Sequence, residues 1–177
     1  MPQYLVITAV GTDRPGISNK VTRLVTESSC NIVDSRIASF GNEFTLIMLL
    51  SGTANAISRI ENTLPLLGQQ HDLTTMMKRT SPHQEKDIFY TIDAFVESED
   101  RPGLTEKFTD FLANRDIDLK TLSAQTLKKG EHQNTFQIQI TAEIFQECHI
   151  MEIQEEFESL CALLSVSGKI NFYKNSL

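Results

Sequence analysis

The stretch Gly11-Thr12-Asp13-Arg14-Pro15-Gly16-Ile17 lies between a β-like run and a helix-like run, and its core returns as Asp100-Arg101-Pro102-Gly103-Leu104. The aspartates that open the two copies of this core, Asp13 and Asp100, lie 87 positions apart in a chain of 177 residues, so the period is about half the chain length. Repetition at such a period indicates a duplicated structural unit, and each half is long enough for a small domain. We therefore predict two domains built on one plan.

The residues around each phrase predict the same order of elements in both halves. Apolar-rich runs at 4–10 and 90–96 predict a strand before each phrase. After the phrase, apolar residues spaced i, i+4, i+7, i+8 predict an amphipathic helix, and two strands, a second helix and a final strand follow. Pro65 is predicted to end the second helix of the first half, because proline interrupts helical hydrogen bonding.

Each half thus has the order β-α-β-β-α-β, which is the order of the ferredoxin-like fold. The right-handed crossover rule places both helices on one face of the sheet. We predict an α+β protein with two ferredoxin-like βαββαβ domains, each an antiparallel four-stranded sheet with helices on one face. Their ranges are 1–79 and 88–177, with a polar linker at 80–87. A tight hairpin is predicted at Gly41-Asn42, and its counterpart at 128–133 is five residues longer.

Charge and composition exclude several classes of partner. The net charge is −7, and the sequence holds no basic cluster large enough to neutralise a nucleic-acid backbone. No apolar run approaches the roughly 20 residues needed to span a bilayer, and the start of the chain does not resemble a secretory signal. Three cysteines without metal-ligand spacing favour reduced thiols. We expect a cytoplasmic protein with no direct nucleic-acid or membrane partner.

The sequence contains no pattern typical of an enzyme. Its four histidines are scattered, and the glycine-rich loop has no Lys-Ser/Thr ending of the kind that binds phosphate. We therefore expect no catalytic residue, no metal ligand and no cofactor.

The repeated phrase has residue types that suit the recognition of an amino acid. Proline presets φ for a first helical turn, and glycine leaves the backbone there uncovered. Exposed N–H groups at Gly16, Ile17 and Ser18 could seat a carboxylate, while Asp13 could receive an ammonium group. The alternative is a turn and cap that gene duplication copied and that bind nothing.

This element order, with Asp13-Arg14-Pro15-Gly16-Ile17 opening a helix and Asn31-Ile32 opening the second strand, resembles the ACT domain. That family consists of regulatory modules that sense small molecules. A chain of two such domains and little else resembles its bacterial transcriptional regulators. The resemblance implies a protein that responds to an amino acid, with glycine as the candidate. It also implies indirect repression, through a DNA-binding activator of the LysR type.

The resemblance also implies the ligand-binding residues by position. They are Asp13, Arg14, Pro15, Gly16, Ile17 and Asn31 in the first domain, and Asp100, Arg101, Pro102, Gly103, Leu104 and Asp118 in the second. The second copy departs at Asp118, because a carboxylate there could repel a ligand carboxylate that the Asn31 amide could bind.

Two other functions stay open at this point. The chain could be an interaction scaffold of the same fold that binds no small molecule. A small transferase or hydrolase on a ferredoxin-like frame is the third candidate.

The two sheets are expected to differ on the face away from the helices. Pairing Tyr4 with Tyr90 requires one extra residue in the second loop and predicts a polar back for the second sheet. The same pairing predicts an apolar back for the first sheet, formed by Leu5, Ile7, Ala9, Ile47 and Leu49. Apolar residues on both faces of a sheet imply that both faces are covered. We predict that the other domain, a second subunit or the activator covers this back, which allows for a homo-oligomer.

Overall fold

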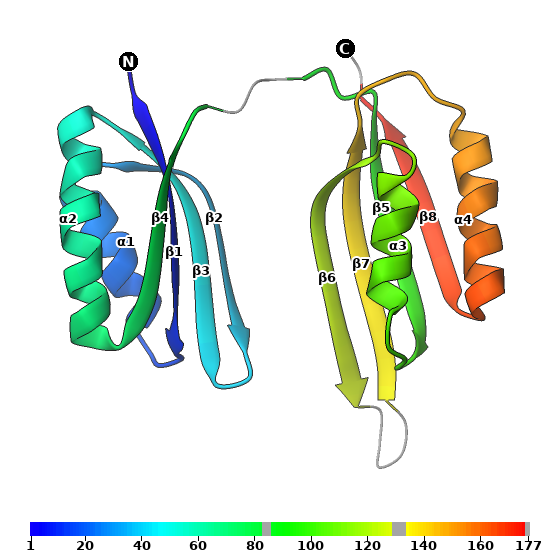
Figure 1. Ribbon diagram of the computed structural model, residues 1–177, viewed down its shortest axis with the longest axis horizontal. Helices are drawn as coiled ribbons and strands as arrows, with labels where there is room; N and C mark the ends of the chain where they lie inside the picture. Colours follow the sequence, from blue (N-terminus) through cyan, green and yellow to red (C-terminus); the bar gives the residue numbers. More distant parts are fainter. Residues whose placement is uncertain (83–85, 129–133, 176–177) are drawn as a thin grey trace. The chain divides into compact units, whose positions relative to one another are not determined.

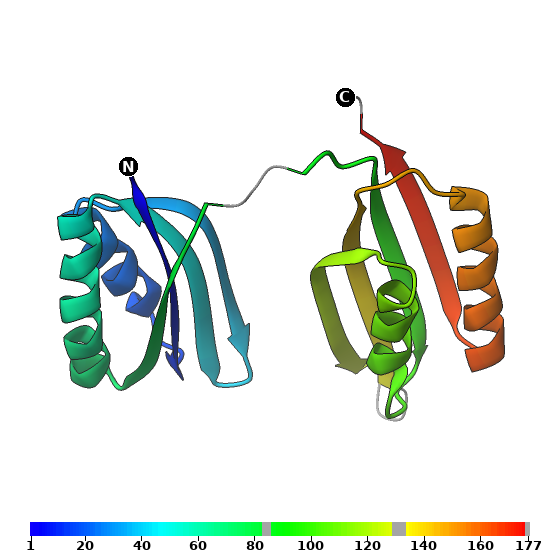
Figure 2. The ribbon, with the colours of Figure 1, turned by 45° about the horizontal axis from the view of Figure 1, so that its top comes forward.

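The computed structural model of the chain describes residues 1–82, 86–128 and 134–175. It consists of two compact units, 1–84 and 85–177. Within each unit the helices cover one face of the sheet and leave the other face without a covering element (Figures 1 and 2). We call these uncovered surfaces the first open face and the second open face.

The first unit is a four-stranded antiparallel sheet in the order β2-β3-β1-β4. Its core lies between the sheet and an apolar stripe on each helix, as the periodicity predicts. The elements are β1 (Gln3–Thr12), α1 (Ile17–Glu27), β2 (Asn31–Phe40), β3 (Glu43–Gly52), α2 (Ala54–His71) and β4 (Leu73–Thr80).

The second unit repeats this arrangement in the order β6-β7-β5-β8, so the predicted fold class is confirmed. The long hairpin loop predicted at 128–133 lies outside the described residues except for its first residue, Lys128. The linker predicted at 80–87 begins inside β4, and its residues 83–85 also lie outside the described part. The elements are β5 (Tyr90–Glu99), α3 (Leu104–Ala113), β6 (Asp118–Lys128), β7 (Asn134–Ile144), α4 (Ile150–Leu164) and β8 (Ser167–Lys174).

Helix α2 continues through Pro65, so the prediction that this proline ends the helix is wrong. Burial continues on both sides of it, from Leu64 to Gly68. A Cβ on Gly68 would come within 2.8 Å of the Leu73 carbonyl oxygen, so the last turn packs tightly against the start of β4. The helix ends instead at Asp72, which adopts the left-handed conformation with φ 54°. Packing on the sheet thus outweighs the local penalty of proline, which is about 3 kcal/mol.

The predicted facing of β1 is also wrong. Leu5, Ile7 and Ala9, predicted on the outer face, are each only 1% exposed and lie in the core under the helices. Leu5 pairs with Leu50 as Ile92 pairs with Ala142, so the offset between the copies is 87 along the whole strand. The second unit therefore has no extra residue in its loop between the first strand and the first helix, and Leu5, not Val6, is the counterpart of Ile92. Because side chains alternate along a strand, this slip of one residue exchanged the two faces of β1.

The predicted facing of β3 agrees with the structure. Phe44, Leu46, Met48 and Leu50 are buried in the core. Ile47 is 46% exposed, and Leu49, which is half-buried, lies on the same side of the strand. Ile47 and Leu49 therefore remain candidate interface residues.

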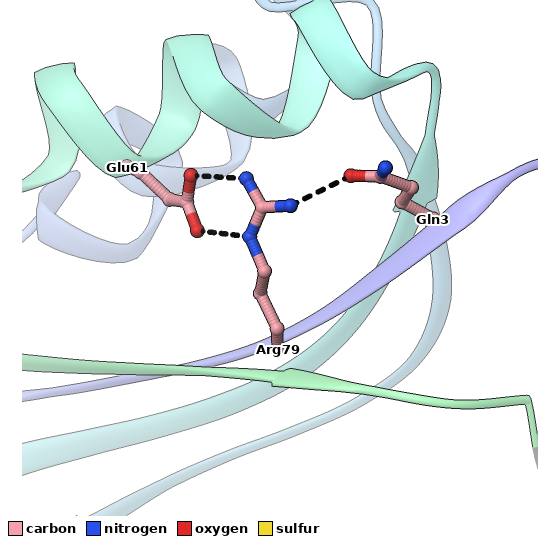
Figure 3. A network of polar contacts seen from close by, with 3 residues as sticks. All are labelled: Gln3, Glu61 and Arg79. Atoms are coloured by element: carbon pink, nitrogen blue, oxygen red, sulfur yellow. Dashed lines mark hydrogen bonds and ion pairs between the residues drawn. The ribbon is translucent and has the colours of Figure 1, made fainter.

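A polar network joins β1, α2 and β4 at one edge of the first unit (Figure 3). The Arg79 guanidinium donates to both carboxylate oxygens of Glu61, each at 2.7 Å, and to the Gln3 side-chain oxygen at 2.9 Å. The hydrogen bonds from Arg79 and its positive charge hold the pKa of the Glu61 carboxyl below its usual range. At the position of Arg79 the second unit has Phe172, which pairs with Ile92 as Arg79 pairs with Leu5.

Candidate functional site

The repeated phrase forms the connection between the first strand and the first helix of each unit. Gly16 caps α1 with φ 83°, and Gly103 caps α3 with φ 85°. Both values lie in the left-handed region, which glycine adopts without steric cost. The Ile17 N–H donates to the Arg14 carbonyl at 3.2 Å and closes the turn. This N–H was predicted to be exposed to a ligand, but it already has a partner. Glycine in the phrase is therefore required by the backbone in both copies.

The arginine of the phrase caps the second helix of its own unit. Arg14 Nη2 donates to the His71 carbonyl at 2.6 Å, at the C-terminal end of α2. Arg101 donates in the same way to the Leu164 carbonyl at the end of α4. A cation at this end of a helix satisfies an unpaired carbonyl and opposes the helix dipole. Both arginines thus have a structural role that the sequence analysis had not predicted.

The aspartate of the phrase ties the turn to the second strand of each unit. Asp13 Oδ2 accepts a hydrogen bond from the Ser39 hydroxyl at 2.6 Å, and Asp100 Oδ2 accepts one from the Thr126 hydroxyl at 3.0 Å. The Asp13 N–H also donates to the Asn42 carbonyl at 2.8 Å. Asp13 thus braces the loop, and the ammonium-binding role predicted for it stays a prediction.

The N-terminal end of α1 is open to approach from outside. A Cβ built on Gly16 would meet no atom within 4 Å, and no side chain caps the helix. The first N–H groups of a helix have no partner inside it, and they carry the positive end of its dipole. Gly103 at the start of α3 has the same open surroundings. An anion could therefore reach either helix end.

A hollow of about 430 Å³ lies beside this opening between α1 and the last turns of α2. We call it the α1 hollow. Pro15 and Gly16 are the two phrase residues that line it. Its other lining residues are Asn19, Lys20, Arg23, Leu24, Glu27, Leu67 and His71.

The α1 hollow has two cations toward its opening and one anion at its far end. Lys20 and Arg23 could attract a carboxylate, whereas Glu27 is the last residue of the helix. None of these three residues was predicted from the sequence. Their spacing from Gly16, at i+4, i+7 and i+11, places them on one face of a helix and is the signal that could have found them.

The equivalent helix face in the second unit has different charges. At the constant offset of 87, Lys20 corresponds to Lys107, Arg23 to Asp110 and Glu27 to Asn114. A carboxylate thus replaces one of the two cations that could receive a ligand carboxylate.

Asn31 and Asp118 lie far from the phrase of their own unit. Asn31 shares a row of the sheet with Ser51 and Tyr4, at the start of β1, whereas the phrase follows the end of β1. Eight residues of strand separate the two ends, or about 26 Å. Asp118, at the start of β6, instead lines a hollow of about 570 Å³ near the C-terminal end of α3. One unit alone therefore cannot combine its phrase with Asn31 or Asp118 around a small ligand.

The cysteines and acidic groups offer no centre for metal or nucleophile chemistry within the described ranges. Burial raises the pKa of the Cys30, Cys148 and Cys161 thiols, and Glu158 adds to the rise at Cys161. Raised values keep the thiols protonated and unreactive. Among residues 1–82, 86–128 and 134–175, no group of three or more His, Cys, Asp or Glu side chains could hold a metal ion. None of the helices in these ranges is both long and apolar enough to cross a membrane.

Comparisons with known proteins agree with the duplicated plan. Residues 3–78 match the family model of the ACT domain. The chain is 43% identical over 169 residues to the glycine cleavage system transcriptional repressor of Escherichia coli, covering 95% of this chain and 89% of that protein. A crystal structure provisionally described as a glycine cleavage system transcriptional repressor is 59% identical, with a TM-score of 0.75 and 99% of each chain covered. A protein of unknown function from Galdieria sulphuraria shares the fold with a TM-score of 0.77 at 22% identity.

Proposed function

The chain belongs to the family of tandem ACT-domain proteins that includes the glycine cleavage system transcriptional repressor, and from this membership we propose an amino-acid-responsive repressor. It binds a small amino acid, with glycine as the first candidate, in the α1 hollow of the first domain. It lowers transcription by acting on a DNA-binding activator of the LysR type. The relatives support a regulatory role, and the ligand and the partner are our proposal.

The observation that carries the ligand proposal is the combination of an open helix end with Lys20 and Arg23 in one hollow. The ligand carboxylate lies at the N-terminal end of α1, where the dipole and the two cations favour it. Glu27 is the last residue of α1, about 16 Å from Gly16 along the helix, so it lies out of reach of the ammonium group of so small a ligand. The first domain is the site in this proposal because Asp110 replaces Arg23 in the second.

The size of the α1 hollow bears on selectivity. About 430 Å³ is many times the volume of glycine, so this hollow alone does not close around an α-carbon. We expect glycine and serine to bind with similar affinity to the wild-type chain. Strong preference for glycine would require further groups around the α-carbon.

Titration calorimetry of the full chain with glycine and serine tests the site. Arg23→Asp copies the second domain's charge and should weaken binding by about tenfold or more, through repulsion of the carboxylate. Asp110→Asn on the second domain is the matched control and should bind as the wild type does. Gly16→Val is a poor test, because a branched side chain at φ 83° strains the turn itself.

The outcomes separate the candidate functions. Equal binding by wild type and Arg23→Asp would remove the α1 hollow as the site. If no amino acid binds the wild type, the scaffold alternative is favoured. Thermal melts provide a second readout, with about 2.7 kcal/mol of stabilisation when ligand is at a hundred times its Kd.

The partner proposal needs its own experiment. A chain of net charge −7 should cause no mobility shift of DNA by itself. Added to a LysR-type activator bound to its operator, it should change the activator's shift or lower a reporter's transcription. A direct shift of DNA by the chain alone would contradict the proposed indirect mechanism.

A further inference from the structure

The first open face is apolar in its centre although no element of its own unit covers it. Ile47 is 46% exposed and Met76 is 68% exposed, and Val10 beside them is 40% exposed. Val6 and Leu49 are half-buried neighbours on the same face, paired across β1 and β3. Contiguous exposed apolar surface of this kind marks an interaction site more often than a monomer surface.

Strand pairing arranges this face in rows that cross the sheet. In one row Asp34 pairs with Leu49, Leu49 with Val6, and Val6 with Lys78. Paired residues point to the same side, so the row has an acid at one edge, two apolar residues in the middle and a base at the other edge. Asp34 also contacts Arg36 within its own strand.

We propose that a second copy of the chain covers the first open face, with the two first-domain sheets packed face to face about a twofold axis parallel to the strands. Such an axis exchanges β2 with β4 and keeps each row at its own level. Asp34 of one copy then meets Lys78 of the other, twice in each dimer. Leu49 of one copy lies over Val6 of the other.

The same symmetry also suits the neighbouring row, in which Arg36 pairs with Ile47, Ile47 with Thr8, and Thr8 with Met76. Ile47 packs on the Thr8 methyl group of the second copy, and the aliphatic stem of Arg36 lies on Met76. A twofold axis that runs across the strands, between these two rows, would instead place Lys78 of one copy over Met76 of the other. Lys78 would then lie far from Asp34 of the other copy. Charge complementarity thus selects the axis parallel to the strands.

The size of the face is sufficient for such a contact. Four strands about 4.8 Å apart and about 26 Å long give roughly 500 Å² for each copy. Two copies bury about 1,000 Å², near the lower limit of specific interfaces. Aligned sheets pack in this way at about 30° in β-sandwiches.

The second open face has neither an apolar centre nor a row with an acid at one edge and a base at the other. Its equivalent row consists of Thr121, Thr141, Asp93 and Asn171, and a hollow of about 450 Å³ interrupts its surface. It therefore supplies matched controls. Gln139 occupies the position of Ile47, because Gln139 pairs with Phe95 as Ile47 pairs with Thr8.

Sedimentation equilibrium of the full chain tests the proposal. Wild type should be a dimer, Ile47→Glu should be monomeric, and Gln139→Glu should stay dimeric. Lys78→Glu and Asp34→Lys should each raise the dimer Kd by about a hundredfold, tenfold for each of the two symmetric contacts. Both substitutions lie on exposed edge strands, so circular dichroism should show an intact fold.

Mixing the two charge variants tests the axis itself. A heterodimer of Lys78→Glu with Asp34→Lys has both contacts attractive again, so the mixture should dimerise at concentrations where each variant alone, with its higher Kd, is monomeric. A mixture that stays monomeric, or a wild type that is monomeric, overturns the proposal. If the wild type is monomeric and Ile47→Glu abolishes binding of the activator, the activator covers the face. If the wild type is monomeric and Ile47 is shielded from solvent, the second domain covers it.

Discussion

The two domains agree in the bonds that hold their loops and differ in the surfaces that they expose. Each phrase has a left-handed glycine, an arginine on the end of the second helix and an aspartate on a hydroxyl of the second strand. The open faces and the helix faces beside the phrases have different chemistry. Duplication thus preserved what the fold needs, and the positions that differ are those from which we infer binding.

The largest expected effect tests a place where the frameworks themselves differ. Gly11 corresponds to Ser98, and a Cβ on Gly11 would lie 2.5 Å from Leu73 Cδ2 and 2.7 Å from the Asp72 carbonyl oxygen. Gly11→Ser should therefore destabilise the first domain by about 1–3 kcal/mol, as overpacking does. Hydrogen exchange, measured by mass spectrometry on peptides of each domain, should show the loss in the first domain alone.

Ser98→Gly is the reciprocal variant for this comparison. It removes a side chain that already fits, so it should cost less than Gly11→Ser does. Equal losses in both domains would contradict the close approach at Gly11.

A middle-sized effect tests the shared framework. Arg14→Met and Arg101→Met each remove one charged hydrogen bond to a helix end, and each should cost about 1 kcal/mol in its own domain. Chemical denaturation with domain-resolved exchange measures both losses. If Arg14→Met abolished amino-acid binding without any loss of stability, Arg14 would be a ligand residue rather than a cap.

The smallest expected effect is on how the stability of the first domain depends on acid pH. The pKa of Glu61 is lowered in the folded state, so the pair with Arg79 stabilises the domain above the carboxyl's unfolded pKa. This stabilisation is lost as the pH falls through the lowered folded value. Arg79→Met should remove that part of the acid dependence and leave the second domain, which has Phe172 there, unchanged. Melting temperatures measured from neutral to acid pH check this, and an identical pH profile for the variant would contradict it.

Much of the fold could be predicted because the two halves of the sequence show the same order of elements independently. The periodicity of both halves gave the element order and the sheet type. It did not give the facing of β1, because this strand is apolar on both sides and its register depends on a single loop residue. Leu5, Ile7 and Ala9 were misplaced for that reason. Pro65 was misjudged because local propensity ignores the tertiary burial that continues to Gly68.

The candidate site could be predicted only in part. The uncovered backbone at the helix start followed from the phrase, but its left-handed conformation did not. The partners of Arg14 and Asp13 are 57 and 26 residues away, and no local pattern points to them. Asn31 was grouped with the phrase by resemblance, although Asn31 lies in β2 level with the start of β1 and the phrase follows the end of β1. Lys20, Arg23 and Glu27 were visible on one helix face, yet they gained meaning only when the hollow beside them was known.

The backbone of Gly16 has a consequence for evolutionary inference. Selection for a folded turn and selection for an uncovered helix end would both retain glycine at this position. An alignment of many relatives would therefore show an invariant residue that carries no information about sensing. Position 23 is informative instead, because its charge is irrelevant to the turn and would drift in lineages that had lost the ligand.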